Sequence, residues 1–153
     1  MPTPETNLHL YNTMTRRKEH FDCAQGDLVR MFSCGPSVYR LPHIGNYRTF
    51  LFQDVLQRYL QYVGFRVDRA INITDIEDKV LDEANKRQTR PELLTKANTC
   101  QYFRDAKLLG IELPDKELLA SRSIDITADM IQTLMERGHA YRHKDKVYFD
   151  PLT

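Results

Sequence analysis

The spacing of apolar and polar positions along the chain predicts most of its secondary structure. An apolar-rich run over residues 28–34 ends at Gly35-Pro36 and predicts a β-strand, and residues 65–72 predict a second. Between them, over residues 46–63, an apolar stripe recurs at helical spacing until Gly64, a typical C-terminal cap. The stripe comprises Phe52, Val55, Leu56, Tyr59, Leu60 and Val63. The order strand, helix, strand indicates a βαβ unit, whose strands are parallel and whose crossover is almost always right-handed.

Three further helices and a hairpin are predicted downstream. A helix over about 75–87 begins with Thr74 or Asp75 as its N-cap and carries acids in its first turn. Pro91 begins the next helix, which runs to Leu109. The last two elements are a helix over residues 126–137 and a hairpin over residues 141–150. We therefore expect an α/β portion over 1–120 and an appended helix and hairpin over 121–153.

Composition and charge narrow the function classes only slightly. The 153 residues are 41% hydrophobic and 28% charged, as in one ordinary soluble domain, which excludes disorder, collagen and a disulfide mini-protein. The net charge of +1 does not indicate a nucleic-acid surface, and the one short basic run, Arg16-Arg17-Lys18, predicts a solvated turn. Three cysteines without a CxxC pair, and no signal or membrane-spanning segment, fit a soluble protein of the reducing cytoplasm.

Polar residues follow both predicted strands at the edge where open α/β sheets bind their ligands. Cys34-Gly35-Pro36-Ser37 follows the first strand, and His43-Ile44-Gly45-Asn46 opens the helix. A His and an Asn three apart across a Gly place two hydrogen-bond donors beside the positive end of a helix, which is typical of a phosphate site. The second strand ends in Asn72-Ile73-Thr74-Asp75. We expect Cys34, His43 and Thr74 to share one crevice.

Each of these groups also has a purely structural interpretation. Taken alone, Cys34 is typical of a buried thiol and His43 of a helix-start cap. Glu77 and Asp78 are expected to be first-turn acids that stabilise a helix dipole. The remaining histidines, which lack metal-like spacing, are expected at the surface: His9, His20, His139 and His143.

The motifs together resemble cysteinyl-tRNA synthetase, a class I aminoacyl-tRNA synthetase. The resemblance is dense from residue 10 to about 87 and looser through 136–141 and 147–150. Its strings are Leu10-Tyr11-Asn12-Thr13, Thr15-Arg16-Arg17-Lys18-Glu19, Met31, Cys34-Gly35-Pro36, Val38-Tyr39, His43-Ile44-Gly45-Asn46, Arg48-Thr49 and Asn72-Ile73-Thr74-Asp75.

This resemblance implies a fold and a reaction. The fold is a Rossmann-like (HUP-type) parallel sheet flanked by helices, with 1–120 as the first half of the catalytic domain and 121–153 as the start of an inserted connective segment. The reaction is the activation of L-cysteine with ATP and Mg²⁺ to cysteinyl-adenylate, followed by transfer to tRNA(Cys).

The resemblance also implies roles for individual residues. His43 and Asn46 would be catalytic and would hydrogen-bond the ATP phosphates. The ATP-binding set is Pro42, His43, Gly45 and Asn46, and the cysteine-binding set is Cys34, Gly35, Ser37 and Thr74. Cys34 matches a zinc ligand that binds the substrate thiolate, a soft-ligand contact that distinguishes cysteine from serine. Ser37 departs from the commoner Thr.

Parts of the family's machinery do not occur in this sequence. Its zinc site needs three more protein ligands, expected beyond residue 153, and no Lys-x-Ser-Lys string is found. We therefore expect weak or no zinc binding and no catalysis by these residues alone. A piece of a longer synthetase is the favoured interpretation. A short synthetase-like paralogue acting as a non-catalytic binding or regulatory module, and a related ligase joining cysteine to a sugar amine, are the alternatives. The sequence does not predict an oligomeric state.

Overall fold

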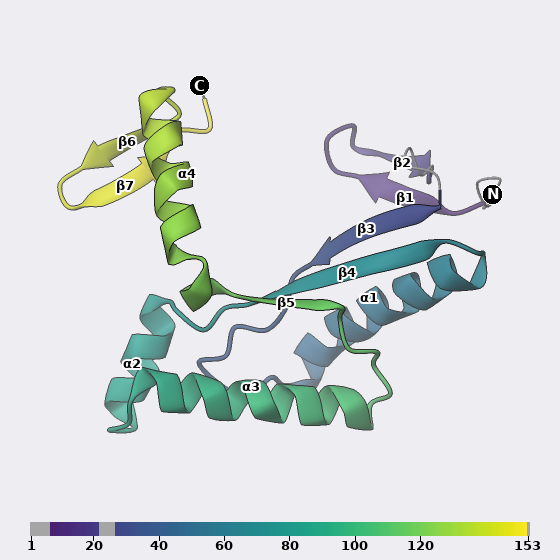
Figure 1. The fold of residues 1–153 in the computed structure, drawn as a ribbon, viewed down its shortest axis with the longest axis horizontal. Coiled ribbons are helices and arrows are strands. Elements are labelled where there is room, and N and C mark those ends of the chain that lie inside the picture. The colour runs from purple at the N-terminus through teal and green to yellow at the C-terminus, as the bar shows by residue number, and fades with distance from the viewer. Residues whose placement is uncertain (1–6, 22–26, 153) are drawn as a thin grey trace.

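A three-stranded parallel sheet forms the centre of the protein, seen in a computed structural model that describes residues 7–21 and 27–152 (Figure 1). The strand order in the sheet is β3-β4-β5. Along the chain, α1 connects β3 to β4, and α2 and α3 connect β4 to β5. The bounds are β3 Leu28–Ser33, α1 Ile44–Tyr62, β4 Arg66–Ile73, α2 Asp78–Lys86, α3 Pro91–Leu108 and β5 Lys116–Leu119. The parallel register from Leu28↔Arg66 to Ser33↔Ile71 confirms the predicted βαβ unit.

The third strand, β5, is absent from the sequence-based prediction. It pairs in parallel with β4 from Ala70↔Lys116 to Ile73↔Leu119. Its four residues, Lys-Glu-Leu-Leu, are mostly exposed, so they show neither an apolar run nor an alternating pattern. A short edge strand of this kind forms because it pairs with the neighbouring strand, and its own sequence carries little strand signal.

Helix α2 begins three residues later than expected, and the prediction of Thr74 or Asp75 as its N-cap is wrong. Thr74 still belongs to the sheet, because its N–H donates to the Pro36 carbonyl at 3.0 Å. The Asp75 carboxylate accepts bonds from the backbone and hydroxyl of Ser121, at 2.9 and 2.5 Å. The N-cap residue is Glu77, whose side chain makes no capping bond.

A hairpin of β1 (His9–Asn12) and β2 (Arg17–His20) precedes the sheet and was not predicted. Arg16 lies in its turn with a φ of 56°, and the other two residues of the basic run begin β2. All three are exposed, so the run is solvated, but the turn prediction holds only for Arg16. Cys23 lies outside the described residues, and Cys34 and Cys100 are free thiols.

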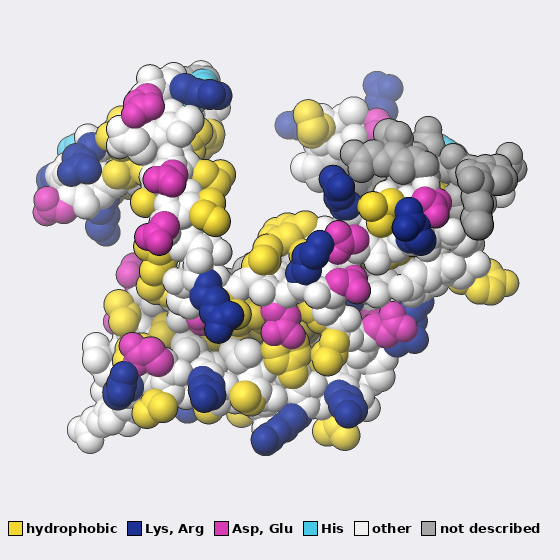
Figure 2. All heavy atoms as spheres, in the orientation of Figure 1, with side chains coloured by type: hydrophobic (Ala, Val, Ile, Leu, Met, Phe, Trp, Pro, Cys, Tyr) yellow, Lys and Arg dark blue, Asp and Glu magenta, His cyan; other side chains and the backbone are white. Residues whose placement is uncertain are grey.

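The main core lies between β4, α1 and α3. Its buried members are Val38, Tyr47, Phe50, Ile71, Ile73, Tyr102, Ala106 and Ile111. The opposite face of the sheet carries the exposed Phe32 and Leu118, and Figure 2 shows hydrophobic side chains over this part of the molecule.

The side of α1 that packs on the sheet is mixed, with the polar Gln53, Asp54 and Gln57 between apolar residues at its two ends. Gln53, Asp54 and Gln57 are buried, whereas Phe52 and Val55 are 67% and 62% exposed. Only part of the predicted stripe, such as Leu60 at 2% exposed, lies in the core.

The C-terminal residues form a separate arm. It comprises a 3₁₀ turn, η1 (Ala120–Arg122), then α4 (Ile124–Glu136) and the hairpin β6 (Ala140–His143) and β7 (Lys146–Phe149). The predicted helix and hairpin are confirmed, with the helix beginning two residues earlier than expected. Helix α4 buries none of its residues and projects from the sheet (Figure 1). Within the described part of the chain, no helix is long and apolar enough to cross a membrane.

Candidate functional site

A pocket of about 410 Å³ lies between the loop that follows β3 and the first turns of α1. This is the carboxyl edge of the sheet, where the sequence predicts a ligand site. The lining residues are Cys34, Gly35, Pro36, Ser37, Tyr39, Arg40, Leu41, Pro42, His43, Asn46, Thr49 and Phe50. Six of the eight predicted site residues are therefore brought together, and Gly45 lies in the adjoining helical turn.

The start of α1 is built by a reciprocal capping box between His43 and Asn46. His43 has extended backbone angles, and its Nδ1 accepts the Gly45 N–H at 3.1 Å. The Asn46 Oδ1 accepts the His43 N–H at 3.0 Å. Both side chains are exposed and use their acceptor atoms for the cap. Because Nδ1 accepts, the neutral ring carries its proton on Nε2, so the pair presents Nε2–H and Nδ2–H₂ as donors.

The electrostatics of the pocket favour an anion. The N-terminus of α1 contributes positive partial charge, and its first turn has no acidic residue. Arg40 adds a guanidinium to the lining, and none of the described lining residues is acidic. Such a combination of donors, helix dipole and cation is suited to phosphate.

Arg40 is held in place from outside the pocket. Its Nε and Nη2 donate to Glu83 Oε2 at 3.1 and 3.0 Å, and Arg87 donates to the same carboxylate at 2.8 Å. The hydrogen bond from Arg40, reinforced by Arg87, lowers the pKa of Glu83 below its ordinary value. Arg40 and Lys79 each lie 5.6 Å from the centroid of the Tyr39 ring, so two cations flank this aromatic wall.

The predicted cysteine-binding residues are connected through Asn72. Its Oδ1 accepts the Gly35 N–H at 3.1 Å, and its Nδ2 donates to Thr74 Oγ1 at 3.0 Å. A parallel bridge pairs Ser37 with Thr74 beyond the end of the regular strands. Thr74 thus touches this segment, although among the described residues it is not one that lines the pocket. A Cβ at Gly35 would lie 1.9 Å from the Asn72 carbonyl oxygen, so only glycine permits this approach.

Two acids at the start of α2 have different roles. Asp78 lies in the first turn of α2, as predicted. Glu77 is the N-cap residue instead, and its carboxylate accepts a hydrogen bond from the Ser37 hydroxyl. This contact crosses 40 residues of sequence, so no local pattern indicates it.

Cys34 is exposed, so its interpretation as a buried structural thiol is wrong. Its Sγ lies 3.6 Å from the Gly35 carbonyl oxygen. No three His, Cys, Asp or Glu side chains come together as a metal site anywhere in 7–21 and 27–152. These residues therefore do not fit a zinc site of their own, because a protein zinc site normally takes several ligands from the chain. Cys34 as one ligand among others stays a prediction.

Several contributors to the pocket were missed by sequence reasoning. Arg40 is the most important, and its position between the Cys-Gly-Pro and His-Ile-Gly-Asn strings was the signal that could have indicated it. Gln53 is another, because its Nε2 donates to the Cys34 carbonyl at 3.0 Å. Its place in the middle of a helix offers no such signal.

The fold and the pocket define an α/β domain with a pocket suited to an anion at the carboxyl edge of a parallel sheet, the arrangement typical of nucleotide-binding domains. Comparison with known proteins narrows this class. A family model described as "tRNA synthetases class I (C) catalytic domain" matches residues 20–153, and the chain belongs to this family.

Three curated relatives from different organisms are each named cysteine–tRNA ligase. The chain is 39% identical to a cysteine–tRNA ligase of Treponema pallidum (strain Nichols), over 94% of this chain and 29% of the relative. It is 37% identical to that of Methanosarcina mazei, over 93% and 30%, and 38% identical to that of Thermotoga maritima, over 94% and 31%. The chain thus spans about three-tenths of the length of these relatives.

Proposed function

We propose that this chain supplies the phosphate-binding and part of the cysteine-binding surface of a cysteine–tRNA ligase. That enzyme would activate L-cysteine with ATP and pass it to tRNA(Cys). Family membership and the relatives' names support the proposal. The observation that carries it is the capping box at α1, which consumes the acceptors of His43 and Asn46 and leaves their donors for an anion.

In the proposed activation step, a carboxylate oxygen of cysteine attacks the α-phosphorus of ATP. The bond from this phosphorus to the bridging oxygen breaks, and pyrophosphate leaves with the electron pair. Negative charge develops on the phosphoryl oxygens, so donors already aimed at them lower the barrier without reorganising. His43 Nε2–H, Asn46 Nδ2–H₂ and the N-terminus of α1 are assigned this role, with Arg40 as a further cation. The chain's contribution is positioning and electrostatics.

Glycine at position 45 supports this assignment. A Cβ there would lie 2.9 Å from Cε1 and 3.0 Å from Nδ1 of the His43 ring, so a larger residue would displace the imidazole. We assign Gly45 and Pro42 to the ATP side of the pocket. Cys34, Gly35, Ser37 and Thr74 form the proposed amino-acid side.

The proposed division of the chain follows the architecture. Residues 1–120 would form the first half of the catalytic domain, because the three parallel strands and the pocket lie there. Residues 121–153 would begin an inserted connective segment. Helix α4 contacts its own hairpin and η1 and buries no residue in the body.

The Asn46→Asp variant tests the phosphate assignment. Aspartate keeps the oxygen that accepts the His43 N–H but replaces the Nδ2 donor with a negatively charged oxygen. We expect ATP affinity, measured by titration calorimetry on this chain, to fall about tenfold or more, because a hydrogen bond to a charged group contributes about 1.5–3 kcal/mol. The melting temperature should not fall, since the acid lies in the first turn of a helix.

The exposed Gln61→Glu variant is the matched control, because it makes the same change of charge near the other end of α1. It should bind ATP like the unmodified chain. Equal ATP affinity in Asn46→Asp and Gln61→Glu would contradict the proposed phosphate site.

A further inference from the structure

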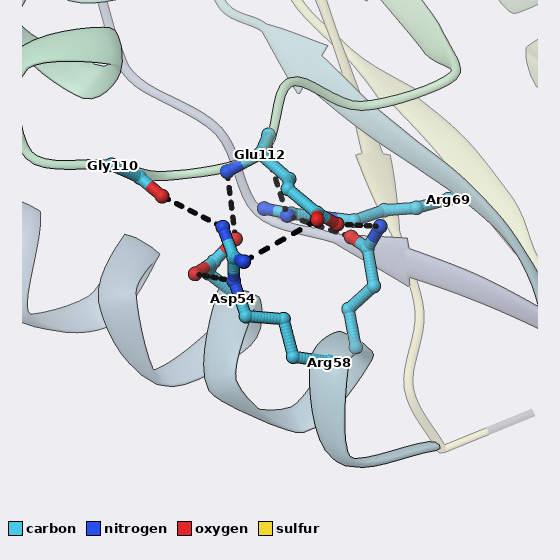
Figure 3. A network of polar contacts seen from close by, with 6 residues as sticks. Asp54, Arg58, Arg69, Gly110 and Glu112 are labelled. Carbon is cyan, nitrogen blue, oxygen red and sulfur yellow. Dashed lines mark hydrogen bonds and ion pairs between the residues drawn. The ribbon is translucent and has the colours of Figure 1, made fainter. Parts of the chain in front are cut away.

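The sheet contains a buried arginine, Arg69, which does not line the pocket. Arg69, in the middle of β4, is 1% exposed and points toward α1 within the network of Figure 3. Its Nη1 donates to Gln57 Oε1 at 3.0 Å, and its Nη2 donates to Gln53 Oε1 at 3.3 Å. A third, longer bond of 3.5 Å reaches the Glu112 carbonyl. The guanidinium is thus surrounded by neutral oxygen acceptors.

The charge of Arg69 is balanced within the network. Arg58 pairs with Asp54 at 2.8 Å and with Glu112 at 3.4 Å, and the Gln57 amide donates to Glu112 at 3.1 Å. Two cations and two carboxylates therefore sum to zero (Figure 3). The network needs no bound anion for neutrality, so Arg69 is not a ligand site.

The Gln53 side chain connects this network to the pocket. Its Oε1 accepts from Arg69, and its Nε2 donates to the Cys34 carbonyl at 3.0 Å. Arginine has donors only, so it can face only the oxygen of the amide. A reversed amide would set its NH₂ against the guanidinium and its oxygen against the Cys34 carbonyl, which is unfavourable on both sides. Arg69 therefore dictates which end of Gln53 faces Cys34.

We propose that Arg69 is a positioning residue that acts through Gln53 to hold the Cys34 carbonyl, and with it the wall of the pocket at the end of β3. The contact lies next to Gly35, whose N–H is held separately by Asn72. The backbone of this segment is thus held from two elements, α1 and β4. What the pocket binds rests on the proposed function, but the positioning itself does not.

Amide hydrogen exchange at Gly35, resolved by NMR on this chain, tests the proposal. Gln53→Glu keeps an oxygen for Arg69 and removes the donor to Cys34. We expect the Gly35 amide to exchange about three- to tenfold faster, the change that corresponds to one net hydrogen bond. Amides of α3 and of the β4–β5 pairing should be unchanged. A merely structural role would accelerate all of them together.

Gln57→Glu is the matched control, because Gln57 lies one turn along α1, accepts from the same arginine and does not contact Cys34. It should leave Gly35 exchange unchanged. Arg69→Met removes the guanidinium and should accelerate Gly35 exchange as Gln53→Glu does, with no further acceleration in the double variant.

Two results would overturn the positioning role: unchanged Gly35 exchange in Gln53→Glu, or equal acceleration in Gln53→Glu and Gln57→Glu. If Arg69→Met fails to fold, the two glutamine variants decide the question. Failure of the phosphate site would appear instead as unchanged ATP affinity in Asn46→Asp, so the two proposals can fail separately.

Discussion

Helix α1 carries two polar clusters that differ in what their hydrogen-bonding groups do. At its start, the His43 and Asn46 side chains are exposed and, toward the described residues, use only their acceptors. In its middle, Gln53 and Gln57 are buried and bond through both their oxygen and their nitrogen. The residue type alone therefore does not show whether a polar side chain binds a ligand or stabilises the fold. What distinguishes a candidate binding site from a structural network is a set of hydrogen-bond donors that the protein does not use internally.

The buried cluster nevertheless has one unsatisfied donor. Among the described residues, Arg69 Nε and Ser33 Oγ are buried without a hydrogen-bond partner. An unpaired buried donor costs about 1–3 kcal/mol, so the network stabilises less than its number of bonds suggests. The network supplies hydrogen-bond partners for the polar residues on the buried side of α1, beside the apolar Tyr47, Phe50 and Leu60.

Arg69→Ala should have the largest effect on stability. It removes the donor shared by two buried amides and leaves a cavity, so we expect the free energy of unfolding to fall by about 3 kcal/mol. Urea denaturation followed by circular dichroism measures this loss. A fall of less than about 1 kcal/mol would show that the buried cluster is as dispensable for folding as the exposed one.

Gly35→Ala should follow, because its Cβ would collide with the Asn72 carbonyl oxygen, which is backbone and cannot rotate away. We expect a loss of about 1–3 kcal/mol, as for overpacking. The same denaturation experiment applies. Wild-type stability in this variant would show that β3 and β4 separate freely at the pocket edge.

His43→Ala should affect binding more than folding. Loss of an N-cap costs about 1 kcal/mol, whereas loss of a donor to phosphate should weaken ATP about tenfold. Parallel thermal melts and ATP titrations separate the two effects. A variant that loses stability but keeps its ATP affinity would assign His43 to the cap alone.

Glu83→Gln should have the smallest effect, a loss of stability near neutral pH that disappears in acid. The pKa of Glu83 is lowered from 4.5 in the folded chain, chiefly by Arg40, so this carboxylate stabilises the fold above that value and the contribution disappears as the pH falls through the folded pKa. In the variant, the melting temperature should decline less steeply between about pH 5 and 3. An identical decline would exclude this ion pair as a source of acid sensitivity.

Periodicity predicted the elements whose environment is local. The βαβ unit, α3 from Pro91 and the C-terminal hairpin follow from apolar spacing and from caps, and all are confirmed. The strand β5 and the hairpin β1–β2 were missed, because exposed short strands lack an apolar signal.

The site was predictable where its residues are contiguous. The strings around Cys34 and His43 indicated the pocket at the carboxyl edge of β3, since the order of elements alone brings these segments together. Two sets of contacts were not predictable, because each depends on how separate segments pack. Glu83 accepts from Arg40, and Asn72 bonds to both Gly35 and Thr74.

Helix α1 shows most clearly what the local sequence determines and what only the tertiary structure determines. Its existence, its start at the His43 cap and its end before Gly64 are written in local residue chemistry, because caps and helical spacing act over a few residues. The choice of its buried side is not, because apolar periodicity favours Phe52 and Val55, which are exposed. The buried side instead combines the apolar Tyr47, Phe50 and Leu60 with Gln53 and Gln57. Burial of the two glutamines becomes favourable only once the chain has folded, because their partners Arg69 and Glu112 lie in other segments.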